Sequence, residues 1–440
     1  MSWRTRWKIA EFVRNSLWIV PGLSVTLAMI LGLLLPEIDR NTESSIGVTF
    51  GEGAAESILS SLASGMITFT GFVFSILLLA VQFGSSQFSP RMLRRFLRDP
   101  TTKIALGMFM ATFIYAFAVL RTVSPSDDEN FIPDFSVSVS LLMLLISMLL
   151  FLRLISRTTH GLRVAAVLRD LGRDGSKVLN RIYPDPVIDE PQPKLRPAES
   201  AGSLTRTIDF RQESGVLQSV DRNGLLRMAT EADVLIELVP PIGDLLLPHT
   251  PLFRIHGNAS EIDDDELRNS VAVGDERTMK QDPAFVFRLL ADISAKALSP
   301  GVNDPTTSIQ ALDQIELLLV LLGTRQLSGG VVVDEHGVER LHVPATTWED
   351  FLSIALDETR MFGETSVQIP RRIRALLEDV HRAVPEFRKP AVEAQIELLE
   401  WSVERSFGSP EERTSANFPD RQGIGSTRST QIKTRPSGGA

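Results

Sequence analysis

One apolar segment of the sequence carries small and hydroxyl-bearing residues at the spacing of a single helical face. They recur at steps of 4, 3, 4, 3, 4 and 7 residues, and they are Ser57, Ser61, Ser64, Thr68, Gly71, Ser75 and Gln82. This pattern predicts either a packing seam, in which small residues let helices approach closely, or a wet path lined by hydroxyl groups. No ionisable residue interrupts the stripe, so it lacks the groups that proton relays and ion-coupling sites usually need.

A polar turn between two later apolar runs is a second candidate site. It contains Ser299, Gly301, Asn303 and Asp304. Asn303 and Asp304 could hold a cation or a polar ligand, but hard cations use about six or more oxygen ligands, and two side chains supply too few. The favoured interpretation is structural. Gly301 would end one helix in a left-handed conformation, and Asp304 would cap the next helix, which Pro305 would begin.

The sequence carries no signature of a metal site or a catalytic centre. The acidic run from Glu261 to Glu266 lacks the ligand spacing and the glycine of an EF-hand loop, so a helix start or a solvated loop explains it better. The histidines form no HxxxH or HExxH pair, and the chain has no cysteine, no Walker A loop and no GxSxG elbow. We therefore expect neither a metal nor a cofactor. An enzyme is the least favoured class, although a triad of distant residues stays an open alternative.

Four segments are long and apolar enough to cross a membrane, which takes about 20 helical residues. They are Leu17 to Pro36, Leu59 to Gln82, Ile104 to Leu120 and Val137 to Arg153. Basic residues precede the first segment, separate the second from the third and follow the fourth, whereas the other two loops are acidic. The positive-inside rule then predicts a multi-pass protein of the bacterial inner membrane with both termini in the cytoplasm.

The segment SPRMLRRFLRDP, between the second and third spans, predicts a short helix with two unlike faces. Apolar side chains share one face, and the other face holds Arg91, Arg94, Arg95 and Arg98. This pattern is typical of a helix that lies in the membrane interface against anionic lipid head groups. The alternative is a cytoplasmic extension of the third span that only holds the topology.

Charge is unevenly distributed along the chain. Residues 1–160 contain 13 Lys and Arg against 11 Asp and Glu, whereas residues 161–440 contain 32 against 43. The second part is therefore acidic and has no long basic stripe. Because nucleic-acid binding depends on clustered Lys and Arg, we expect no nucleic-acid partner.

The predicted fold is an α-helical membrane domain of four transmembrane helices plus a cytoplasmic α+β domain. The expected parts are the transmembrane domain (1–160), a helix and proline-rich linker (161–203), a small β domain (204–275), a mainly helical domain (276–408) and a disordered tail (409–440). Within the helical domain, Val331 to Val343 predicts a hairpin, and Thr347 with Asp350 predicts a capping box at a helix start.

Two long blocks resemble a bacterial family of predicted multi-pass membrane proteins that is labelled only as a domain of unknown function. The blocks are QFSPRMLRRFLRDPTTKIALGMFMATFIYAFAVLRTV and ALSPGVNDPTTSIQALDQI. The resemblance spans most of residues 10–405 and implies four spans and a cytoplasmic domain, but no activity. The turn Ile242-Gly243-Asp244-Leu245 is also similar to that of the lipoyl and biotinyl hammerhead folds, which hints at fold shape alone.

These patterns favour an oligomeric channel-like or transport-related protein whose cytoplasmic domain assembles and gates the complex. A membrane-anchored sensor or scaffold without conduction is the alternative, and a membrane-bound enzyme comes third. The expected partners are a bilayer with anionic head groups and further copies of the same chain. The sequence names no ion or small ligand.

Overall fold

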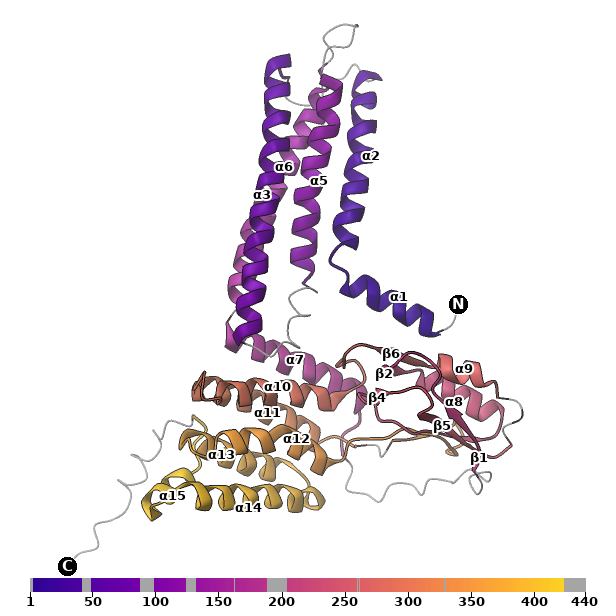
Figure 1. The fold of residues 1–440 in the computed structure, drawn as a ribbon, viewed down its shortest axis with the longest axis vertical. Coiled ribbons are helices and arrows are strands. Elements are labelled where there is room, and N and C mark those ends of the chain that lie inside the picture. The colour runs from indigo at the N-terminus through magenta and orange to yellow at the C-terminus, as the bar shows by residue number, and fades with distance from the viewer. Residues whose placement is uncertain are drawn as a thin grey trace, which may run out of the picture. The chain divides into compact units, whose positions relative to one another are not determined.

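The computed structural model describes residues 3–41, 49–87, 99–123, 132–161, 163–187, 204–258, 260, 262–327 and 330–422. The chain divides into two compact units. The four-helix unit is Ile9–Arg163, and the sheet-containing unit comprises Met1–Lys8 and Val164–Ala440. Figure 1 labels elements of both units where there is room.

The four-helix unit is built from long apolar helices, which follow the shorter helix α1 (Trp3–Asn15). Within the described ranges, four helices are long and apolar enough to cross a membrane. They are α2 (Ile19–Asn41), α3 (Glu52–Gln87), α5 (Pro100–Val123) and α6 (Asp134–Gly161). Each predicted span falls on one of these helices, except that the first was expected to begin at Leu17 and α2 begins at Ile19. The helices run further than the apolar segments because polar residues at their ends continue the backbone hydrogen bonding.

Helix α5 occupies the centre of the four-helix unit. Of its apolar window, 61 % is buried inside the protein, against 22 % for α2, 17 % for α3 and 22 % for α6. Glycines bring α2 and α5 together. A Cβ atom on Gly32 would lie 2.7 Å from Cβ of Ala118, and one on Gly107 would lie 2.8 Å from the hydroxyl of Ser24. The close helix contact that small residues permit is therefore found between α2 and α5.

The sheet-containing unit has two sheets, a mixed sheet of five strands and an antiparallel sheet of three strands. Its strands are β1 (Leu204–Asp209), β2 (Gly215–Val220), β3 (Leu235–Leu238), β4 (Leu245–Leu246), β5 (Pro251–His256), β6 (Val271–Gly274), β7 (Val331–Val333) and β8 (Glu339–His342). One sheet has the order β1-β5-β3-β8-β7 and the other has the order β4-β2-β6. Alternating apolar residues of both sheets meet in one core, in which Phe210, Phe253 and Ile236 are fully buried.

Helices form the other part of the sheet-containing unit, and Figure 1 shows α10 to α15 stacked away from the strands. The helices are α7 (Val164–Ile182), α8 (Arg222–Glu231), α9 (Asp264–Asn269), α10 (Pro283–Ala297), α11 (Pro305–Gly323), α12 (Trp348–Phe362), α13 (Gln368–Ala383), α14 (Lys389–Ser406) and α15 (Pro410–Ala416), with a 3-10 turn at Glu386–Arg388. Thr347 and Asp350 form the predicted capping box at the start of α12.

The hairpin β7–β8 joins the two parts of this unit. It lies within the predicted helical domain, yet β8 pairs in parallel with β3, where Ile236 faces Leu341. The five-stranded sheet is therefore completed by a segment about a hundred residues further along the chain. Local periodicity predicts the hairpin but not this pairing, because strand partners distant in sequence leave no local pattern.

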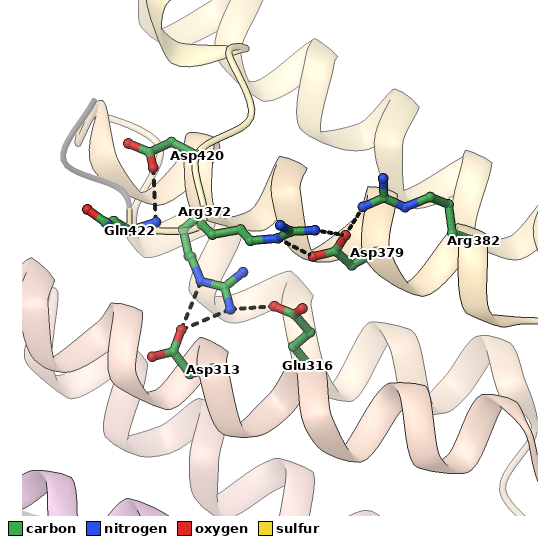
Figure 2. A network of polar contacts seen from close by, with 8 residues as sticks. Asp313, Glu316, Arg372, Asp379, Arg382, Asp420 and Gln422 are labelled. Carbon is green, nitrogen blue, oxygen red and sulfur yellow. Dashed lines mark hydrogen bonds and ion pairs between the residues drawn. The ribbon is translucent and has the colours of Figure 1, made fainter. Parts of the chain in front are cut away.

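The chain stays helical and packed beyond Gly408, where composition predicted a disordered tail to begin. Ser409 and Glu412 form a capping box at the start of α15, and Ala416 is fully buried. Further on, the guanidinium of Arg421 donates two 2.8 Å hydrogen bonds to the carboxylate of Asp379 on α13. Figure 2 shows Asp379 in this network, together with Asp420. The capping-box spacing is a sequence signal that the composition argument overlooked.

Candidate functional site

The predicted stripe lies on the exposed side of α3. All seven stripe residues are exposed, whereas the opposite face of α3 is buried, with Leu59, Met66 and Val73 at 4 % exposure or less. A Cβ atom on Gly71 would meet nothing within 4 Å. Within the four-helix unit the stripe is therefore not a packing seam. A packing seam on this face would require a partner outside the four-helix unit.

Three hydroxyl groups of the stripe, those of Ser64, Thr68 and Ser75, donate hydrogen bonds to their own helix. Ser64 donates to the carbonyl of Ser60 at 2.6 Å, Thr68 to that of Ser64 at 3.0 Å, and Ser75 to that of Gly71 at 3.0 Å. Such bonds to the preceding turn leave the hydroxyl oxygen able to accept a hydrogen bond. The stripe is thus a weakly polar face that tolerates an apolar neighbour and can also contact water.

A groove of about 430 Å³ runs beside the first turns of the stripe. Ser57, Ser61 and Gly65 line it from α3, and Leu141 and Leu144 line it from α6. No charged side chain is among its lining residues, so the groove suits an apolar or weakly polar occupant.

The predicted interfacial segment with Arg91, Arg94, Arg95 and Arg98 lies outside the described residues. Its lipid contact stays a prediction from the sequence.

The polar turn between α10 and α11 has a structural role, because it caps and connects the two helices. Asp304 caps α11 as predicted: it accepts a 3.1 Å hydrogen bond from the backbone N–H of Thr307, and Pro305 is the first residue of the helix. The prediction for Gly301 is wrong, because the left-handed residue is Asn303, with φ at 47°. Asparagine tolerates this conformation better than most residues. Its backbone N–H donates to the carbonyl of Ser299 at 2.9 Å and so closes the turn.

The acidic run, from Asp263 to Glu266, forms a helix start, while Glu261 lies outside the described residues. Asp263 caps α9 by accepting a 3.0 Å hydrogen bond from the backbone N–H of Asp265. Arg268, one turn later, pairs with Asp265 at 2.8 Å and with Asp264 at 3.4 Å. These carboxylates have protein partners, which agrees with the interpretation favoured from sequence.

A cavity of about 470 Å³ lies inside the sheet-containing unit, and sequence reasoning missed it. It is lined by residues at the end of α7, at the starts of α8, α10 and α12, and in the loop between β3 and β4. Pockets of this volume hold small-molecule ligands in other proteins. We call it the Arg222 cavity, after the first residue of α8.

Side-chain hydrogen bonds fix the start of α8 at the wall of this cavity. The amide of Gln281 pairs with the backbone of Val220 in the manner of a strand neighbour, donating to its carbonyl at 3.0 Å and accepting from its N–H at 2.9 Å. Asp221 then caps α8 by accepting a 3.1 Å hydrogen bond from the N–H of Gly224. Arg222 therefore starts from a well-anchored backbone.

A second arginine of the cavity is paired. Arg277 donates from Nε to Asp282 at 2.7 Å, and the other oxygen of Asp282 caps α10 by accepting from the N–H of Phe285 at 3.1 Å. Burial raises the pKa of Asp282, although the bond from Arg277 opposes this. Gly243 makes room for the pair. Its φ is 103°, and a Cβ atom there would lie 2.5 Å from Nε of Arg277.

Arg222 differs from Arg277 because its charge is left uncompensated. Its Nε atom is buried and has no hydrogen-bond partner, and none of its nitrogens forms an ion pair within the described chain. Burial lowers the pKa of Arg222, and burial raises the pKa of neighbouring Tyr183 to about 12. The tyrosine is therefore neutral at pH 7 and does not balance the arginine.

The residues of the Arg222 cavity come from positions 182 to 354 and form no contiguous motif. One signal was available, the turn Ile242-Gly243-Asp244, which was recognised only as a hint of fold shape. A glycine held at positive φ by an approaching guanidinium cannot be told from an ordinary turn glycine in one sequence.

Comparisons with known proteins place the chain among membrane proteins. The family model described as predicted membrane protein (DUF2254) matches residues 14–379. Uncharacterised proteins of Mycobacterium bovis and Mycobacterium tuberculosis are 27 % identical to this chain over 442 residues, which covers 97 % of this chain and 82 % of each relative. No solved structure matches the chain. The resemblance inferred from the two sequence blocks is thereby confirmed, and the chain belongs to the DUF2254 family of predicted membrane proteins.

Proposed function

We propose that the protein is a homo-oligomeric, channel-like protein of the bacterial inner membrane. The observation that supports this is the outward-facing stripe on α3, a helix whose other exposed side chains include Ile67, Phe72 and Leu79. Because α5 fills the centre of the four-helix unit, a path for ions or small solutes has to lie between copies. The stripes of neighbouring copies would then line that path or the contact beside it.

The second part of this proposal concerns the sheet-containing unit. We assign it to the cytoplasm on the charge of the loops, with a role in assembly and gating. A reporter that is active only in the cytoplasm should work when fused after Arg163 and fail when fused after Asp128. A periplasmic signal from the fusion after Arg163 would contradict the orientation.

The particle mass of the full chain in a nonionic detergent tests the oligomer. We expect a defined multiple of the chain mass by light scattering, since four helices are too few to enclose a pore. A monodisperse monomer that also fails to conduct after reconstitution into liposomes would overturn the channel.

A membrane-anchored sensor without conduction is the second candidate, and the Arg222 cavity favours it. This cavity lies wholly within the sheet-containing unit, and its use requires no pore. A monomer that binds a small ligand and conducts nothing would support this candidate over the first.

A further inference from the structure

The Arg222 cavity combines an unpaired cation with the starts of several helices. Arg222 is the first residue of α8, Pro283 the first of α10, and Asp350 lies in the first turn of α12, and all three line the cavity. The N-terminal end of a helix carries partial positive charge and attracts anions. Arg222 and these helix starts therefore contribute positive potential to a cavity whose lining also contains three carboxylates, those of Asp244, Asp282 and Asp350.

The acidic residues of the cavity do not neutralise Arg222. Asp282 is 4 % exposed and is already bonded to Arg277 and to the backbone of α10. Asp350 is exposed and belongs to the capping box with Thr347. Asp244, the remaining carboxylate of the lining, is exposed to solvent. Each of these carboxylates either has a partner already or is hydrated.

A buried donor without an acceptor is costly, because it has lost its hydrogen bonds to water and gained none. The penalty is larger for a charged group. The planar guanidinium presents its N–H groups as a fork that fits the oxygens of a carboxylate or phosphate in a bidentate manner. An anionic group in the cavity would supply acceptors to the terminal N–H groups of Arg222, which form no hydrogen bond within the described chain.

We propose that the Arg222 cavity binds a small molecule through an oxyanion group, a phosphate or a carboxylate, which is held by the guanidinium of Arg222. Tyr183, a neutral hydroxyl-bearing side chain of the lining, is a further donor for the same group. This site is independent of conduction and goes beyond the proposed channel.

Thermal unfolding of the full chain in a nonionic detergent tests the site. Sodium phosphate, sodium acetate and sodium chloride are titrated at equal ionic strength. We expect phosphate, acetate or both to raise the Tm of the wild-type protein above its value in chloride, because a ligand that binds only the folded state stabilises it. The comparison of the two oxyanions identifies the preferred group.

Arg222→Gln removes the fork, and we expect it to weaken the apparent affinity for the stabilising anion by about tenfold or more. Without added oxyanion, its Tm should stay close to that of the wild type, since Arg222 is half-buried and forms no ion pair within the described chain. The matched control is Arg227→Gln on the same helix, because the Arg227 side chain is 67 % exposed. This control should keep the wild-type response.

Three results would overturn the proposal. The first is a wild-type Tm that rises no more in phosphate or acetate than in chloride. The second is an anion response that Arg222→Gln retains in full. The third is an equal loss of the response in Arg227→Gln, which would indicate a general charge effect.

Reconstitution into nanodiscs distinguishes two sources of the oxyanion. Equal phosphate affinity in phosphatidylcholine and phosphatidylglycerol nanodiscs would support a water-soluble ligand. Competitive loss of phosphate affinity in phosphatidylglycerol alone would support a lipid head group as the occupant of the same site.

Discussion

The two units of the molecule arrange their polar groups in opposite ways. On α3, the hydroxyl groups of Ser64, Thr68 and Ser75 are exposed, and each donates a hydrogen bond to its own backbone. In the Arg222 cavity, the half-buried arginine forms no ion pair within the described chain, and its buried Nε atom lacks a partner. The first arrangement has a function only if another molecule covers the helix from outside. The second has a function only if a ligand enters.

The largest effect on stability is expected from replacing a glycine at the contact between α2 and α5, compared with a glycine on the exposed side of α3. Gly32→Leu adds a side chain at a position where even a Cβ atom would lie 2.7 Å from Cβ of Ala118. Overpacking of this kind costs about 1–3 kcal/mol or more. The full chain in detergent should therefore unfold at a clearly lower temperature than the wild type.

Gly71→Leu is the matched change on the outward face, where a Cβ atom meets nothing within 4 Å. The four-helix unit should keep its stability, while the mass of the particle in detergent should fall if copies meet along α3. An unaltered oligomer would indicate that the stripe faces lipid, and the proposed contact between copies would be wrong.

In the sheet-containing unit, removing a paired carboxylate should destabilise the protein, whereas removing unpaired Arg222 should not. Arg421 is the leading cause that lowers the pKa of Asp379 to about 2 from its ordinary value of 3.8. An acid with a lowered pKa stabilises the folded state above its unfolded pKa, and this contribution is lost as the pH falls from about 4 to about 2. Asp379→Asn should remove about 1 kcal/mol at pH 7, because the exposed Arg421 is screened by solvent.

Urea unfolding of both proteins at pH 7 and near pH 3 checks this prediction. The difference between wild type and Asp379→Asn should shrink at the lower pH. A difference that is independent of pH would mean that the pair with Arg421 does not hold the end of the described chain.

The smallest effect is expected from Thr68→Val on the stripe. The change keeps the side-chain shape and removes a hydroxyl group that bonds to its own helix at 3.0 Å. Interhelical hydrogen bonds in bilayers average about 0.6 kcal/mol, so stability should change by less than that. Ion flux through reconstituted protein should nevertheless fall, since a ring of valines favours dewetting of a narrow path. Unchanged flux would separate the stripe from the path.

Features that depend on residue type and spacing over a few neighbouring positions could be predicted from the sequence. The apolar segments of α2, α3, α5 and α6 exceed the length needed to cross a bilayer, and the strand β5 alternates in burial. The caps at Asp304 and Thr347 follow from residue type and spacing. Such signals depend on neighbours within a few residues, which a single sequence displays directly.

Features that depend on distant partners could not be predicted. The close contact of small residues between α2 and α5, where a Cβ atom on Gly32 would lie 2.7 Å from Ala118, has no stripe of its own in the sequence that predicts it. Similarly, Arg222 resembles any other helical arginine until Gln281 and Asp282 are brought beside the start of α8. One sequence does not reveal which residues meet after the chain has folded.

A cysteine scan of α3 tests the central claim most directly, because the chain contains no native cysteine. Single cysteines are placed at stripe positions 61, 64, 68, 71 and 75, and at Ile67 and Ile76 as controls, which are also exposed but are apolar and lie to either side of the stripe. We predict that a membrane-impermeant, water-soluble thiol reagent modifies the stripe positions faster than the controls in the reconstituted full chain. Uniform protection of stripe and controls alike would contradict a wet path between copies.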